Sequence, residues 1–199
     1  MEGLRVEVSV DELFWEACTS GDLETVKRLS QDPLLDLGWA DPAAGRTGFY
    51  RACSHNRVEV VRYLLSEEQR ERIVVNQTQH QGGTPLNVAC QDNFVEVVEL
   101  LLKDPRCDAD IPDMYGATPL WVCSQYGFLE LVKRLLLYRP NLMLMTKTMM
   151  GVSGWANKTA REIAQLKGHA EVKELLVESE WNQGLVHAKL RREFRVQGF

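Results

Sequence analysis

The sequence predicts an all-α solenoid, in which helix–turn–helix units stack along one axis. Two observations predict it: a six-residue motif recurs along the chain, and a Gly or Asn follows each copy at a fixed distance. Self-similarity with a period of 20–50 residues is typical of stacked repeats. The chain has 199 residues, 45% hydrophobic and 26% charged, which is the composition of an ordinary folded protein.

The recurring motif marks the start of a helix in each unit. Its clearest copies are Thr84–Ala89 and Thr118–Cys123, its weaker copies are Thr47–Ala52 and Thr159–Ala164, and a degenerate first copy is Glu12–Ala17. Successive copies lie 35, 37, 34 and 41 residues apart. Thr supplies an N-cap oxygen, and Pro at the first helical position gives up no hydrogen bond, so the copies that begin with Thr-Pro predict a helix N-terminus.

A second anchor keeps the same phase and marks the reversal between two helices. Four residues after each copy stands a residue that tolerates left-handed backbone. These residues are Gly21, Asn56, Asn93, Gly127 and Gly168. Apolar residues then recur at helical spacing, as over 95–102, which predicts a second helix in each unit.

The unit resembles the ankyrin repeat, a β-turn and two antiparallel helices in about 33 residues with a T-P-L-H-x-A motif. The resemblance covers residues 10–179 in five units and is most specific at Asp113–Leu120. It implies an ankyrin-repeat solenoid with short β-hairpin connections. The His of the family motif is absent, and its place is held by Trp15, Tyr50, Asn87, Trp121 and Glu162.

Two extensions flank the repeats. Apolar residues alternate in the N-terminal extension, residues 1–9, as in a strand that lies along the first unit, stays loose or pairs with another protein. In the C-terminal extension, residues 180–199, Val186, Leu190 and Phe194 fall on one helical face among arginines. This pattern predicts either a helix that closes the stack or a basic amphipathic element for a partner or an anionic surface.

The resemblance implies that a partner binds on the concave face, on the hairpin tips and the exposed ends of the first helices. Carried over by position, it predicts these partner-binding residues: Arg46, His55, His80, Gln81, Gln91, Asp92, Met114, Tyr115, Trp121, Gln125, Tyr126 and Trp155. Aromatic anchors of the fourth unit dominate this set. Trp121 has a second interpretation, since it also fits as packing between units. The Met-rich segment 141–155 is either an elongated hairpin packed on the last units or an adaptable contact surface.

Composition narrows the function classes. The net charge of −5 disfavours a nucleic-acid binder and favours a partner with a basic patch. No apolar run reaches about 18 residues, and the first residues lack the pattern of a signal peptide, so we expect no membrane span. Five cysteines without close spacing predict a cytoplasmic or nuclear protein with no metal site.

No catalytic motif accompanies the repeats, and we expect no catalytic residue and no cofactor. Cys18, Cys53 and Cys90 occupy the same place in successive units, which indicates core packing instead of a single reactive thiol. We therefore predict a monomeric, non-catalytic protein–protein interaction module. The alternative is a regulatory or targeting subunit that modulates an enzyme partner.

Overall fold

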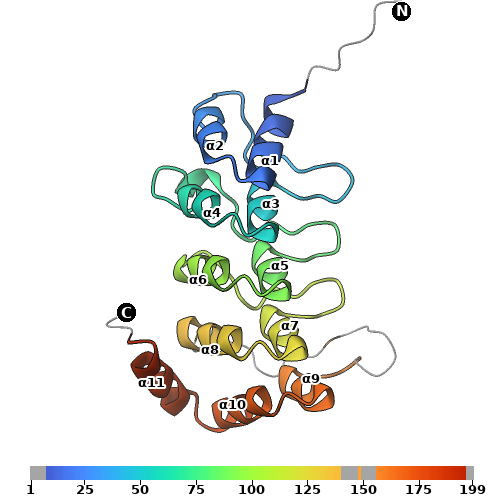
Figure 1. Ribbon diagram of the computed structural model, residues 1–199. Helices are drawn as coiled ribbons and strands as arrows, with labels where there is room; N and C mark the ends of the chain where they lie inside the picture. Colours follow the sequence, from blue (N-terminus) through green and yellow to red (C-terminus); the bar gives the residue numbers. More distant parts are fainter. Residues whose placement is uncertain (1–7, 140–147, 149–155, 196–199) are drawn as a thin grey trace, which may run out of the picture.

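The computed structural model describes residues 8–139, 148 and 156–195, and in them helices stack in two columns (Figure 1). The first helices are α1 (Val10–Ser20), α3 (Gly48–Ser54), α5 (Pro85–Gln91), α7 (Pro119–Tyr126) and α9 (Ala160–Lys167). The second helices are α2 (Leu23–Leu29), α4 (Val58–Leu64), α6 (Val95–Lys103), α8 (Leu129–Tyr138) and α10 (Ala170–Trp181), followed by α11 (Gln183–Glu193). Each first helix packs on the next first helix, so the all-α solenoid is confirmed.

The predicted hairpin connections are turns and loops without named strands in the described residues. Their β-pairing is a single isolated bridge between Ala40 and Thr47, and a 3-10 turn, Arg70–Arg72, follows α4. Hydrogen bonds to the side-chain carboxylates of Asp41 and Asp113, more than strand ladders, hold the tips of these loops.

The first helices begin where the motif predicts, with one exception. The hydroxyls of Thr47, Thr84, Thr118 and Thr159 each accept the backbone N–H three residues on. In the first unit the cap is Ser9, which forms a capping box with Glu12. The first motif copy, placed at Glu12–Ala17, therefore lies inside a longer helix, because a better N-cap stands one turn earlier.

The reversal residues all have the left-handed backbone expected of them. Their φ angles are 87° at Gly21, 54° at Asn56, 57° at Asn93, 74° at Gly127 and 81° at Gly168.

At two reversals the next unit explains why the residue is Gly. A Cβ on Gly21 would lie 2.8 Å from Cδ of Arg57, and a Cβ on Gly127 would lie 2.4 Å from Nδ1 of His169. Each of these two side chains also donates an N–H to the helix carbonyl two residues before the glycine, at 2.8 Å for Arg57 and 3.1 Å for His169. The next unit thus satisfies a carbonyl that the end of an α-helix leaves free.

The residues that replace the family's His keep its place between units. In three units the side chain at this position donates an N–H to the carbonyl just before the next unit's threonine. The bonds run from Trp15 to Arg46 (2.8 Å), from Asn87 to Ala117 (3.4 Å) and from Trp121 to Lys158 (3.0 Å). A donor side chain at this position therefore links each of these units to the next.

The core lies between the columns and runs along the whole stack. Cys18, Cys53 and Cys90 are all 0% exposed at one position of successive first helices, which confirms their packing role.

The helix α11 closes one end of the stack by packing on α8 and α10 (Figure 1). Val186 and Leu190 are buried, and the guanidinium carbon of Arg134 lies 4.9 Å from the ring centroid of Phe194. The structure thus shows the closing helix, one of the two alternatives for this extension. At the other end Val10 begins α1, and the strand pattern before Val8 lies outside the described residues.

Candidate protein-binding face

The loops that join the units project beyond the column of first helices, on the right of Figure 1. Backbone hydrogen bonds join neighbouring tips: His80 donates to the carbonyl of Ala44 (2.9 Å), and Met114 donates to that of Gln81 (2.9 Å). We call the surface made by these tips and the C-terminal ends of the first helices the loop face. Because these three tips are tied together, the loop face is continuous from the second unit to the fourth.

Carboxylates organise the tips from within. Asp41 accepts the backbone N–H groups of Ala44 (2.8 Å) and Arg46 (2.9 Å), and Asp113 accepts those of Tyr115 and Ala117, both at 2.9 Å. Partial burial pushes the pKa of Asp41 upward, but the hydrogen bonds from Arg46 and Ala44 outweigh it and hold the pKa below its usual range. The tips are therefore preformed.

Most of the predicted partner-binding residues lie on this face. Exposed among them are His80, Gln81, Gln91, Asp92, Met114, Tyr115 and Tyr126. Arg46, His55 and Gln125 are half-buried, and Trp155 lies outside the described residues, as does the Met-rich segment apart from Thr148.

Met114, Tyr115 and Tyr126 form what we call the aromatic patch of the fourth unit. They are 47%, 45% and 46% exposed. The ring of Tyr126 stacks on Phe128, with centroids 5.5 Å apart and planes 18° apart, and the backbone of Tyr115 is fixed by Asp113. Large side chains are thus held on the surface at little further entropy cost.

Trp121 belongs to the interior instead of this patch. It is 5% exposed and clusters with Ala117 and Ile163, with Val122 packed alongside. Its indole N–H is used by the carbonyl of Lys158. The structure therefore places this ring as packing between units, which is the second interpretation drawn from the sequence, and the ring is not presented to a partner.

Two residues outside the predicted set shape the other end of the loop face. The guanidinium carbon of Arg51 lies 4.6 Å from the ring centroid of Trp15, in a cation–π contact. Arg46 and His55 lie at the same end of the loop face. We call Trp15, Arg46, Arg51 and His55 together the cationic patch. In the sequence, the only sign of this contact was Trp15 at the His position of a degenerate unit. Its partner, Arg51, belongs to the next unit, and the contact becomes visible only when the two units are stacked.

His55 is held in one place by three contacts. Its Nδ1 lies 3.1 Å from the Arg51 carbonyl and 2.9 Å from the hydroxyl of Ser54, and its Nε2 lies 3.2 Å from Nη2 of Arg51. Burial, and then the charge of Arg51, lower the pKa of His55. The neutral ring, with its proton on Nδ1, satisfies both neighbours.

The thiols and the charged clusters show no activated nucleophile. All five cysteines are free and buried. Burial raises the pKa of Cys18, Cys53 and Cys90, and it raises the pKa of Cys107 to about 12. Within the described part of the chain, no three His, Cys, Asp or Glu side chains converge as metal ligands, and none of its helices has the length and apolar character that a bilayer crossing requires.

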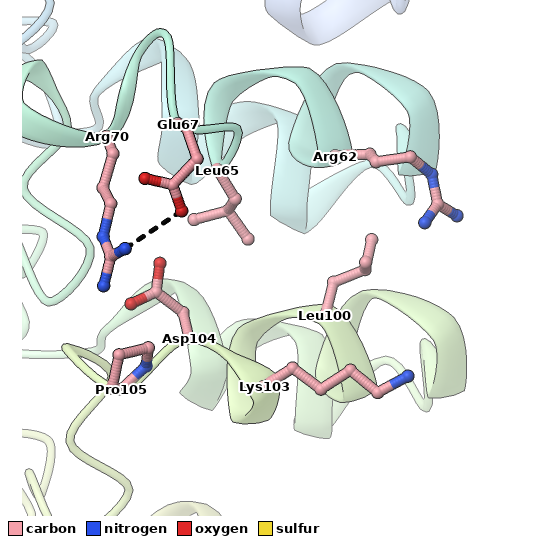
Figure 2. Close-up of a pocket in the computed structure, with 8 residues that line it drawn as sticks. All are labelled: Arg62, Leu65, Glu67, Arg70, Leu100, Lys103, Asp104 and Pro105. Atoms are coloured by element: carbon pink, nitrogen blue, oxygen red, sulfur yellow. Dashed lines mark hydrogen bonds and ion pairs between the residues drawn. The ribbon is translucent and has the colours of Figure 1, made fainter.

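A cavity of about 250 Å³ lies on the opposite side, between α4 and α6 (Figure 2). Leu65 and Leu100 line it, and charged side chains surround them. These charges already have partners within the protein: Arg70 with Glu67 (3.0 Å), Arg62 with Glu96 (2.9 Å), Lys103 with Glu99 (2.7 Å) and Asp104 with Arg106 (2.6 Å). A charged ligand there would have to displace existing ion pairs, so the loop face is the better candidate.

The sequence profile for ankyrin repeats (three copies) matches residues 13–113 and again 69–148. The chain belongs to the ankyrin-repeat family. Repeats of this family form protein-interaction modules, and the stacked units and projecting loops described above are the framework of such a module.

Three yeast proteins with the name palmitoyltransferase AKR1 are similar to part of this chain. The protein of Lachancea kluyveri is 35% identical over 105 residues, and that of Kluyveromyces lactis is 30% identical over 110. The protein of Naumovozyma castellii is 43% identical over 54 residues. These matches cover 50%, 53% and 27% of this chain but 13%, 14% and 7% of the relatives, so the likeness concerns a small part of each.

Proposed function

We propose that this ankyrin-repeat chain is a monomeric, non-catalytic module of the cytoplasm or nucleus that binds a protein partner on its loop face. The observation that carries the proposal is the aromatic patch, in which Met114, Tyr115 and Tyr126 are each close to half exposed on a preformed support. Tyr side chains are enriched among the residues that dominate interface energies. Free, buried cysteines of raised pKa support a reducing compartment and a non-catalytic role.

The test is partner capture from source-cell lysate by the wild type and by a Tyr115→Ala/Tyr126→Ala double variant, read by mass spectrometry. We expect the double variant to keep its helical circular dichroism and to weaken capture at least tenfold, ~1.4 kcal/mol. Trp181→Ala is the matched control, because that ring is 86% exposed on α10, outside the loop face. Equal capture by the wild type and the double variant would overturn the proposal.

The second candidate is a regulatory or targeting subunit whose binding changes the activity of an enzyme partner. The similarity to segments of proteins named palmitoyltransferases favours an enzyme context, because repeats like these occur there beside a much longer sequence. The captured partner distinguishes the two candidates. A change in its catalytic rate on adding this chain supports the regulatory role, and an unchanged rate supports a scaffold.

A further inference from the structure

The cationic patch contains two arginines that contact one indole, Arg46 through its backbone carbonyl and Arg51 through its guanidinium. Trp15 donates its indole N–H to the carbonyl of Arg46 at 2.8 Å, and Arg51 lies over the ring of Trp15. Arg46 belongs to the loop before α3, and Arg51 belongs to α3 itself. The stacking of the first two units therefore brings both cations to the same end of the loop face.

Arg51 is fixed in position. Its Nε donates to the hydroxyl of Thr19 at 3.1 Å, and that hydroxyl donates to the carbonyl of Trp15 at 2.8 Å. Its Nη2 lies 3.2 Å from Nε2 of His55. Among the described residues nothing accepts a hydrogen bond from its Nη1, so one donor of a pre-oriented guanidinium is left for another molecule.

Arg46 has an unsatisfied donor. Its Nε is buried and has no hydrogen-bond partner, and its guanidinium forms no ion pair with any described residue. Asp41 is the acid beside it, but both oxygens of Asp41 already accept backbone N–H groups. Buried donors in folded proteins nearly always have an acceptor, so the Nε of Arg46 is a donor available to another molecule.

The charged residues around the cationic patch also favour an anionic ligand. Arg57 approaches from α4 and donates to the carbonyl of Thr19 at 2.8 Å, so it adds a third cation. The repeating acids of the chain are on the second helices, in their exposed first turns: Glu24, Glu59, Glu96, Glu130 and Glu171. The net charge of −5 therefore does not describe this end of the loop face, where Arg46, Arg51 and Arg57 outnumber Asp41, the acid whose charge acts on Arg46 and Arg51.

We propose that Arg46 and Arg51 bind the carboxylates of an acidic, Asp- or Glu-rich segment of the protein partner. The proposal rests on the loop face being the binding surface. Guanidinium groups match the planar, two-oxygen geometry of a carboxylate. A carboxylate suits a half-buried site beside an indole better than a phosphoryl dianion, whose removal from water requires more compensation.

The probe is a fluorescein-labelled octaglutamate peptide, with an octalysine peptide and a phosphoserine peptide as comparisons. Its affinity is measured by fluorescence anisotropy, and its site by shifts of the Trp15 indole and the Arg Nε–H signals in ¹⁵N NMR spectra. We expect octaglutamate to bind and to move the signals of Trp15, Arg46 and Arg51. No binding, or a preference for the phosphoserine peptide, would overturn the proposal.

Arg46→Gln and the double variant Arg46→Gln/Arg51→Gln are expected to weaken octaglutamate binding by at least threefold and tenfold. Arg28→Gln/Arg192→Gln removes the same charge from exposed positions on α2 and α11, and we expect it to bind as the wild type does. Arg46→Gln loses no side-chain hydrogen bond within the described protein, so it reports on binding even if the double variant melts earlier. Equal weakening by the matched control would overturn the proposal, because general charge would then explain the binding.

The partner captured in the earlier test separates this inference from the proposed function. If that partner is lost from Tyr115→Ala/Tyr126→Ala but stays fully bound to Arg46→Gln/Arg51→Gln, the loop face binds proteins and only the acidic contact is wrong. If both double variants lose it while Arg28→Gln/Arg192→Gln keeps it, the partner spans both ends of the loop face, as proposed.

Discussion

Trp15 and Trp121 occupy the same position of the repeat and have different surroundings. Each indole donates to the carbonyl that precedes the next unit's threonine, at 2.8 and 3.0 Å. The next unit then places a residue against the ring, and at the same motif position this residue is Arg51 in one case and Ile163 in the other. The ring of Trp15 thus supports a cationic surface, and the ring of Trp121 is 5% exposed in the core. The role of a repeat position is set partly by its neighbour.

Exchanging the residues that pack against the two rings, Arg51 and Ile163, is expected to give the largest difference between the two sites. Ile163→Arg places a charge without a partner at a position that is 0% exposed, and we expect it to cost about 3–5 kcal/mol of unfolding free energy. Arg51→Ile removes a half-buried cation at the surface, and we expect it to cost about 1 kcal/mol or less. Thermal melting measures both, with the first variant roughly 6–20 °C lower. Equal shifts would show that the two rings share one kind of environment.

Truncating the rings tests the same difference from the other side. We expect Trp121→Ala to cost about 3–5 kcal/mol, because a buried ring and its hydrogen bond to Lys158 are lost. Trp15→Ala removes a half-buried ring at the edge of the stack, and we expect about half that cost. Urea denaturation followed by circular dichroism measures the difference. A larger cost for Trp15→Ala would contradict the assignment of Trp121 to the core.

The pH dependence of stability tests the surroundings of His55 in the cationic patch. Burial, and then the charge of Arg51, hold the pKa of His55 below its ordinary value of about 6.5, so the unfolded chain takes up this proton at a higher pH than the folded chain does. The stability due to neutral His55 is therefore present above about pH 6.5 and is lost as the pH falls toward the lower folded pKa.

The variant His55→Gln removes this dependence. We expect a small effect, seen as a shallower fall of the urea midpoint between pH 7.5 and pH 5.5 than in the wild type. Identical falls in the two proteins would show that His55 does not titrate with folding.

The helix starts and reversals were readable from the sequence because they depend on local chemistry. Thr84 and Thr118 cap their helices through bonds within one turn, and the left-handed slot accepts few residues besides Gly and Asn. The cap of α1 is also local, since Ser9 forms a capping box with Glu12, but the degenerate first copy of the motif, which has no Thr, did not indicate it.

The loop face was predictable only in part. Exposed residues such as Tyr115 and Gln91 followed from their positions in the repeat. The contact of Trp15 with Arg51 did not, because it joins residues of two units and depends on their exact stacking. The burial of Trp121 likewise depends on Ile163, which is supplied by the following unit.

The two glycines covered by the following unit limit how these units can be recombined. Gly21 leaves room for Arg57, and Gly127 leaves room for His169, so each pair is one structural feature divided between two units. A hybrid protein that joins units from different chains at Thr47 or at Thr159 would separate one of these pairs. Junctions placed inside α4 or α6 would keep each glycine and its donor on the same fragment, so we expect chimeras joined there to retain the native stacking.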